Sequence, residues 1–150
     1  MSEPASTLIQ ASAVASEGRA LLFEGEPGVG KSSLARALID RGARLIGDDG
    51  VLLKRIGDQL IALPPPNIAG LVEVRGVGLL EFPTANGAPV SLILTLGEDD
   101  TRLPETLENR PILGTSVPVL PFAPGRVAPA LRAELALAKH GLAVSYKPET

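Results

Sequence analysis

The sequence contains no cysteine, and this absence excludes disulfide bonds, thiol catalysis and thiolate metal sites. Its single histidine excludes a metal site built from several histidines. Tryptophan is absent, and the aromatic residues are one tyrosine and three phenylalanines. So few rings leave little surface on which nucleic-acid bases could stack.

The sequence also lacks a strong charge excess and a long hydrophobic run. Its 14 basic and 17 acidic side chains give a formal net charge of −3, without the basic excess of proteins that bind duplex nucleic acid. Proline, glycine or a charge interrupts each apolar run well before the roughly 20 residues that span a bilayer. The N-terminal residues do not resemble a signal peptide. We therefore expect a cytoplasmic protein that binds neither nucleic acid nor membranes.

The length and composition fit one globular domain. A chain of 150 residues can bury most of its apolar surface without a second domain. We expect one α/β domain over residues 1–150, with loose ends at about residues 1–6 and 144–150.

The first half of the chain has the pattern of a strand, a helix and a second strand. A compact apolar run predicts a strand at residues 20–24, and residues 31–41 have the periodicity of a helix that Gly42 ends. Residues 43–46 then read as a second strand. This order predicts a βαβ unit. Further strands are expected at residues 51–53 and 60–62.

The second half is rich in proline, because twelve of the 14 prolines follow Leu63. Residues 90–96 predict a strand of branched side chains, and residues 117–122 an edge strand, because prolines interrupt it. A helix is expected over residues 130–140, capped by Gly141. The apolar stripe predicted for this helix consists of Leu131, Leu135 and Ala138.

A phosphate-binding loop is the strongest motif. The segment GEPGVGKS, from Gly25 to Ser32, fits G-x-x-x-x-G-K-[ST] between a predicted strand and a predicted helix. The alternative is a plain glycine-rich turn, to which the Lys31-Ser32 pair would add nothing. Lys31 should reach the β- and γ-phosphates of ATP, and Ser32 should bind Mg²⁺. The predicted nucleotide-binding residues are Gly25, Glu26, Pro27, Gly28, Val29, Gly30, Lys31, Ser32 and Ser33.

Two adjacent acids, Asp48 and Asp49, follow the predicted strand after this helix. Ligands of open α/β sheets bind at the carboxyl ends of the strands. One acid could hold the metal ion while the other accepts a proton from an attacking hydroxyl. The alternative is an Asp-Asp-Gly turn that only joins two strands. The phosphate loop nearby favours the functional interpretation.

Three segments together carry a resemblance to the bacterial HPr kinase/phosphorylase family. These are the phosphate loop, the segment RGARLIGDD one helix later, and the segment EVRGVG, in the family's order and with similar spacing. The likeness extends from about Leu21 to Arg126. It implies a single P-loop domain with a mixed sheet, similar to the nucleotide core of phosphoenolpyruvate carboxykinase. It also implies the short form of the family, which has the catalytic domain alone.

The resemblance assigns a role to individual residues. Asp49 would be the general base toward a serine of the phosphocarrier protein HPr, and Asp48 would arrange the metal ion and the base. Glu73 would assist at the Mg²⁺ site, Arg75 would neutralise the transferring phosphoryl group, and Arg126 would lie near the active site. An exposed cross-strand ion pair is the alternative for Glu73 and Arg75.

Two positions depart from the family pattern. Gln10 stands where the family usually has a histidine that orients the catalytic aspartate, and Ser33 stands where the family often has an acid. A glutamine can donate a hydrogen bond but cannot titrate.

The resulting hypothesis is an ATP- and Mg²⁺-dependent serine kinase of phosphotransferase-system regulation that acts on HPr or an HPr-like protein. The resemblance also implies the reverse reaction with inorganic phosphate, and homo-oligomers, commonly hexamers. The alternatives are a catalytically degenerate ATP-sensing module, which Gln10 and Ser33 would explain, and a small-molecule kinase or plain NTPase.

Overall fold

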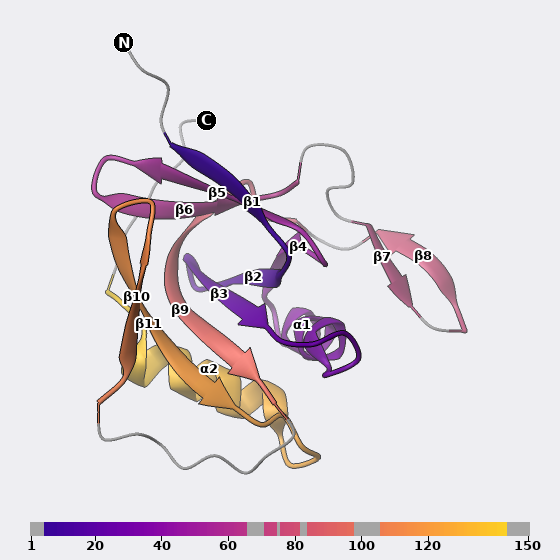
Figure 1. Ribbon diagram of the computed structural model, residues 1–150. Coiled ribbons are helices and arrows are strands. Elements are labelled where there is room, and N and C mark those ends of the chain that lie inside the picture. The colour runs from indigo at the N-terminus through magenta and orange to yellow at the C-terminus, as the bar shows by residue number, and fades with distance from the viewer. Residues whose placement is uncertain (1–4, 66–70, 75, 82–83, 98–105, 144–150) are drawn as a thin grey trace.

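The computed structural model describes residues 5–65, 71–74, 76–81, 84–97 and 106–143, and these form two sheets and two helices (Figure 1). In chain order the elements are β1 (Ser6–Ile9), β2 (Ser12–Ser16), β3 (Arg19–Glu24), α1 (Lys31–Asp40), β4 (Arg44–Gly47), β5 (Val51–Ile56), β6 (Gln59–Leu63), β7 (Leu71–Val74), β8 (Gly78–Glu81), β9 (Ala88–Leu96), β10 (Glu108–Ile112), β11 (Thr115–Phe122) and α2 (Pro129–His140). No helix among the described residues is long and apolar enough to cross a membrane.

Strand β9 lies at the centre of the larger sheet, which has nine strands of mixed direction. β3 and β11 run parallel to β9, and β6 runs antiparallel to its first residues. The strand order is β1-β5-β6-β9-β3-β2-β4, and β10 pairs with β11. The carboxyl ends of β3, β9 and β11 therefore meet at one edge of the sheet, which is where ligands of α/β proteins bind.

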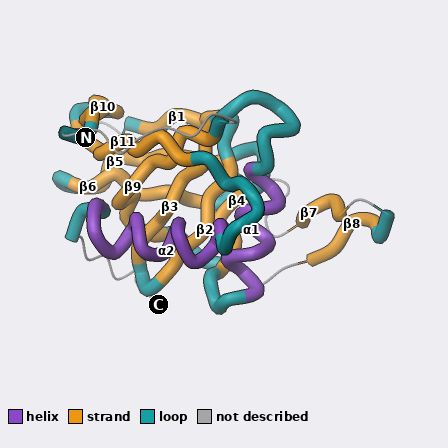
Figure 2. Tube along the Cα trace, turned by 90° about the horizontal axis from the view of Figure 1, so that it is seen from below, coloured by secondary structure: helices purple, strands orange, loops and turns teal. Residues whose placement is uncertain are grey.

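The sheet has an apolar core on each face, as the alternation of side chains in β3 shows. Leu21 and Phe23 belong to the core that contains residues of both helices, whereas Ala20 and Leu22 belong to the core that β5 and β6 share. In Figure 1 the strands β1, β5 and β6 cross above the central strands, and Figure 2 shows α1 and α2 on the opposite face. The sheet is therefore covered on one face by helices and on the other by its own outer strands.

The predicted strand–helix–strand order is present, but its two strands are not neighbours. β3 and β4 are both antiparallel to β2, which lies between them. They consequently run in the same direction, as a βαβ unit requires, with an inserted strand. The predicted loose end at residues 1–6 is too long, because Ser6 pairs with Lys54 at the start of β1.

The prediction of an edge strand over residues 117–122 is wrong. β11 lies between β10 and β9, but its two halves have different partners. Pro118 is opposite Asn109 of β10, and Pro121 is opposite Thr95 of β9. In this register each proline is paired with a strand on one side only, which is the situation in which strands tolerate proline.

The predicted apolar stripe of the last helix is also wrong. Leu131 and Leu135 are 41% and 57% exposed, and Ala138 is exposed. The buried residues of α2 are Ala130, Ala133 and Leu137. Small alanine side chains allow the helix to approach the sheet closely, so the most hydrophobic stripe is not the one that packs.

We expect Gly47→Ala to lower the free energy of unfolding by about 2 kcal/mol, because a Cβ there would lie 2.0 Å from the carbonyl oxygen of Gly50. Urea unfolding measures this. Gly50→Ala is the matched control, since its Cβ would meet only Pro65, at 4.0 Å, and its change should stay within about 0.5 kcal/mol. Equal losses in the two variants would contradict this prediction.

Candidate functional site

The phosphate loop joins β3 to α1, and its glycines are required by its backbone. Gly25, Gly28 and Gly30 have φ of 154°, 83° and 109°, values that side chains disfavour. A Cβ on Gly25 would lie 2.9 Å from the carbonyl oxygen of Leu96, so the loop rests against the end of β9. Gly30 caps α1 without a side-chain hydrogen bond. The first N–H groups of the helix therefore face the space that the loop encloses, as an anion site requires.

The side chain of Lys31 folds back over this loop. Its Nζ donates a hydrogen bond to the carbonyl oxygen of Gly25, at 2.7 Å. The ammonium group is thereby held at the loop, where phosphate oxygens could replace the carbonyl as its partner.

Asp48 connects the start of α1 with β2. Its Oδ1 accepts a hydrogen bond from Ser32 Oγ at 2.6 Å and another from Ser12 Oγ at 3.0 Å. Ser12 is 1% exposed, so its hydroxyl group depends on this bond for a partner. Asp48 is half-buried and fixed by both hydroxyl groups.

Asp49 has a different environment from its neighbour. It is exposed, its φ is 63°, and Gln10 Nε2 lies 3.5 Å from its Oδ1, a long hydrogen bond. The structure thus places Gln10 beside Asp49, as the motif alignment predicts. A carboxylate at the rim with one weak partner remains free to accept a proton.

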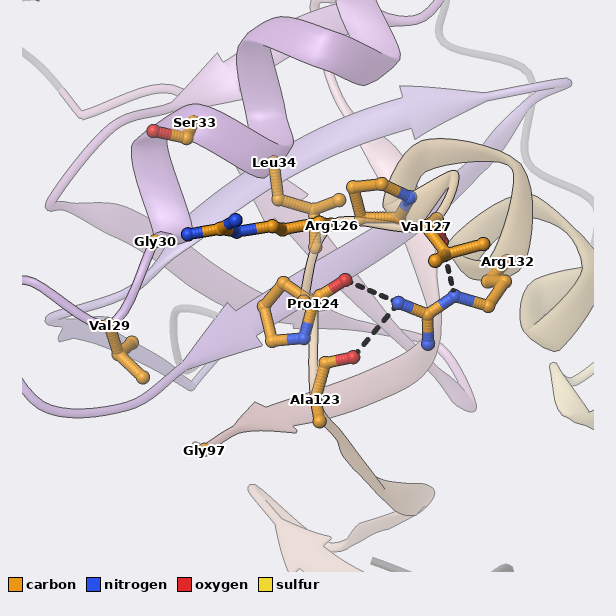
Figure 3. A pocket seen from close by; sticks show the side chains of 12 residues that line it. Val29, Gly30, Ser33, Leu34, Gly97, Ala123, Pro124, Arg126, Val127 and Arg132 are labelled. Atoms are coloured by element: carbon orange, nitrogen blue, oxygen red, sulfur yellow. Dashed lines mark hydrogen bonds between the residues drawn. The ribbon is translucent and has the colours of Figure 1, made fainter. Parts of the chain in front are cut away.

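These residues line a pocket of about 560 Å³. Its walls include Gln10, Ser12, Lys31, Ser32, Asp48 and Asp49. A larger pocket of about 1050 Å³ adjoins it and shares Gly30 and Ser33 (Figure 3). Arg126 lines this second pocket, so the structure brings it to the phosphate loop but not to the pair of acids.

The structure does not bring Glu73 into the site. Glu73 lies on β7, which pairs with β8 in a separate hairpin that extends away from the larger sheet in both views (Figures 1 and 2). Arg75 lies outside the described residues. The metal role of Glu73 and the charge-neutralising role of Arg75 stay predictions.

Oxygen ligands suited to Mg²⁺ are present. Ser32 and Asp48 offer a hydroxyl and a carboxylate beside the phosphate loop. Within the described ranges, no cluster of three or more His, Cys, Asp or Glu residues could hold a metal ion. Mg²⁺ rarely needs such a cluster, because it is commonly bound by one or two carboxylates together with substrate phosphates and water.

Sequence reasoning missed two residues of the site. Ser12 begins a strand whose other end is also a serine, Ser16, so the sequence held no signal that singles it out, and only the structure shows that it is buried. Arg132 lines the larger pocket. Its position in the first turn of the predicted helix could have pointed to it, because the helix dipole disfavours a positive charge there unless another interaction holds it.

Known proteins resemble this chain. The family model "HPr Serine kinase C-terminal domain" matches residues 5–141. HPr kinase/phosphorylase of Clostridium acetobutylicum is 35% identical over 148 residues, which cover 87% of this chain and 48% of that protein. The protein of the same name from Clostridium tetani is 40% identical over 125 residues, which cover 73% of this chain and 40% of that protein. This chain thus spans less than half the length of either relative.

A solved structure supports the predicted fold. The "Hpr(Ser) kinase/phosphatase from Coxiella burnetii" has a TM-score of 0.78 and 28% sequence identity, and the match covers 89% of this chain and 95% of that one. The predicted α/β fold with a mixed sheet is confirmed. The likeness to phosphoenolpyruvate carboxykinase stays a prediction.

We expect Ser12→Ala to raise the Mg²⁺ concentration needed for half-maximal ATP binding about tenfold, because Asp48 loses one of the two groups that orient it. Titration of fluorescent ATP at a series of Mg²⁺ concentrations measures this. Ser16→Ala, at the other end of the same strand, is the control and should leave the titration unchanged. An unaltered Mg²⁺ dependence in Ser12→Ala would show that Ser12 does not position Asp48.

Proposed function

The chain belongs to the family of HPr serine kinase C-terminal domains, and on this premise we propose that it catalyses phosphoryl transfer from ATP to a serine of HPr or an HPr-like phosphocarrier protein. The observation that supports this most is the convergence of Lys31, Ser32, Asp48 and Asp49 on one pocket. These groups supply the cation, the metal ligands and the base that phosphoryl transfer requires.

The two acids divide the work according to their surroundings. Asp48 is fixed by two hydroxyl donors, one of which begins the helix that follows the phosphate loop, and this suits a group that holds a metal ion in place. Asp49 is exposed and accepts only a long hydrogen bond from Gln10 among the bonds described for it. It can therefore receive the proton of a serine hydroxyl that a protein substrate brings to the rim.

Two further groups act on the phosphates. Lys31 would exchange its hydrogen bond to the carbonyl oxygen of Gly25 for bonds to phosphate oxygens. Its positive charge would stay at the loop throughout. Mg²⁺, when Ser32 and Asp48 bind it, would neutralise part of the phosphate charge. The adjoining pocket of about 1050 Å³ is large enough for the nucleoside part of ATP.

The proposal includes the reverse reaction and the biological setting that the family resemblance implies. Inorganic phosphate would enter the same cradle, because the loop offers it the same N–H donors. Residues 1–150 would be one catalytic domain, in a cytoplasmic homo-oligomer, commonly a hexamer in this family. Arg75 keeps its proposed role of neutralising the transferring phosphoryl group, Glu73 its proposed role at the metal ion, and Arg126 its place near the active site, where it lines the pocket that we assign to the nucleotide.

One observation favours a second function. Gln10, rather than a histidine, lies beside Asp49, and Ser33 is exposed in place of an acid. A chain that binds ATP without transferring phosphate would be a nucleotide-sensing module.

Transfer of ³²P from γ-labelled ATP to purified HPr, and release of phosphate from phosphoserine-HPr with added inorganic phosphate, test the proposed function. Asp49→Asn should keep ATP binding but lower transfer at least about 100-fold, and asparagine tolerates the left-handed backbone at this position. Lys31→Ala should lose both. Binding of ATP without turnover in either direction would favour the sensing module over the kinase.

We expect Gln10→His to raise transfer near neutral pH about tenfold, because a neutral imidazole beside Asp49 can hold the carboxylate in the orientation in which it accepts the serine proton. The pH profile of kcat should gain a limb near the usual pKa of histidine, about 6.5. Gln10→Asn cannot titrate and should keep the wild-type profile. Identical profiles for the two variants would contradict a contact between position 10 and the base.

A further inference from the structure

The side chain of Arg132 binds the backbone that precedes its own helix. Its Nε donates to the carbonyl oxygen of Val127 at 2.8 Å, and its Nη2 donates to the carbonyl oxygens of Ala123, at 3.0 Å, and of Pro124 (Figure 3). The guanidinium group also lies over the ring of Phe122, 5.0 Å from its centre. One side chain therefore holds both ends of the loop between β11 and α2.

This loop, residues 123–128, has a backbone that needs such support. Gly125 and Ala128 have φ of 55° and 41°, and left-handed backbone at a non-glycine residue is costly. The planar guanidinium group offers several donors in a fixed geometry, which a lysine cannot reproduce. Its hydrogen bonds to three carbonyl groups offset the unfavourable position of a cation near the N-terminus of α2.

The 123–128 loop forms one wall of the larger pocket. Val29, Gly30, Ser33 and Leu34 form the facing wall, next to the phosphate loop. In Figure 3 the side chain of Arg126 extends across the pocket toward Gly30 and Ser33, while Arg132 lies on the other side of the loop backbone. The orientation of Arg126 therefore depends on a loop that Arg132 holds.

We propose that Arg132 is a positioning residue for nucleotide binding, which fixes the 123–128 loop so that Arg126 points at the phosphate loop. The inference rests on the proposed function, because it takes the larger pocket as the place of the nucleotide. Arg132 also lines this pocket, but its guanidinium donors are bonded to three carbonyl groups of the loop, so we assign it a role that acts through Arg126.

The test is a double-mutant cycle read out by binding of fluorescent MgATP. Arg132→Lys keeps the positive charge but loses the planar set of guanidinium donors. It should weaken MgATP binding about tenfold, the size expected for a lost charge-assisted hydrogen bond. Arg126→Ala should weaken binding on its own. In the Arg126→Ala background, Arg132→Lys should have less than about a twofold further effect, because positions that act through one another are not additive.

Arg41→Lys is the matched control. Arg41, at the end of α1, bonds to Glu134 of α2 at 2.7 Å, and this hydrogen bond raises the pKa of Arg41. The substitution Arg41→Lys disturbs the docking of α2 at a point away from the 123–128 loop, and it should leave MgATP binding unchanged. In steady-state transfer, Arg132→Lys should raise KM for ATP while kcat changes less than about twofold, a split that a general loss of stability would not produce.

The outcomes separate this inference from the proposed function. Wild-type protein that binds no MgATP would overturn both. Normal wild-type binding together with an unaffected Arg132→Lys, or an equal effect of Arg132→Lys in both backgrounds, would overturn this inference alone. Should Arg132→Lys not fold, Phe122→Leu removes the ring beneath the guanidinium group and keeps an aliphatic side chain in the core to which Phe122 belongs. It should weaken binding about threefold, and an unchanged affinity would overturn the inference.

Discussion

One carboxylate oxygen holds the site together. Oδ1 of Asp48 accepts hydrogen bonds from Ser32, in the first turn of α1, and from Ser12, at the start of β2. Hydrogen bonds to a charged acceptor are stronger than those between neutral groups, and a buried hydroxyl without its partner would be costly. Three segments that are far apart in the sequence are therefore fixed at the carboxyl ends of the strands. The phosphate loop, whose other end rests on β9 through Gly25, depends on this arrangement for its shape.

Two neighbouring aspartates acquire opposite properties from this frame. The backbone turns at Asp49, where φ is 63°, so that one acid faces the hydroxyl groups beneath the loop and the next faces the rim. Gly47 permits this tight turn because it has no Cβ. An identical pair of side chains thus provides an anchored carboxylate and an exposed one, and the difference comes from backbone conformation and hydrogen bonding rather than from residue type.

Local signals in the sequence predicted the phosphate loop, α1 and the place of both acids, because each depends on residues close together in the chain. Gln10 followed from motif spacing alone, and its contact with Asp49 agrees with it. The insertion of β2 between β3 and β4 could not be predicted, since strand partners are chosen by packing over long sequence distances. The same reason hid Ser12, and it hid the buried side of α2, where Ala130, Ala133 and Leu137 are buried instead of Leu131 and Leu135.

That alanine-lined contact determines how α2 is held. Ala130, Ala133 and Ala136 offer no large side chains that interlock with the sheet, and only Leu137, near the end of the helix, adds a large apolar side chain to this core among the described residues of α2. Directional polar bonds fix the register instead: Arg132 at the start of the helix, Glu134 with Arg41 farther along, and past its end the backbone N–H of Leu142, which donates to the carbonyl oxygen of Ser91 at 2.9 Å. The first of these bonds leads to the 123–128 loop. Loop and helix are consequently tied to each other at the start of α2, whereas the bonds farther along and past its end attach the helix to α1 and β9 independently of the loop.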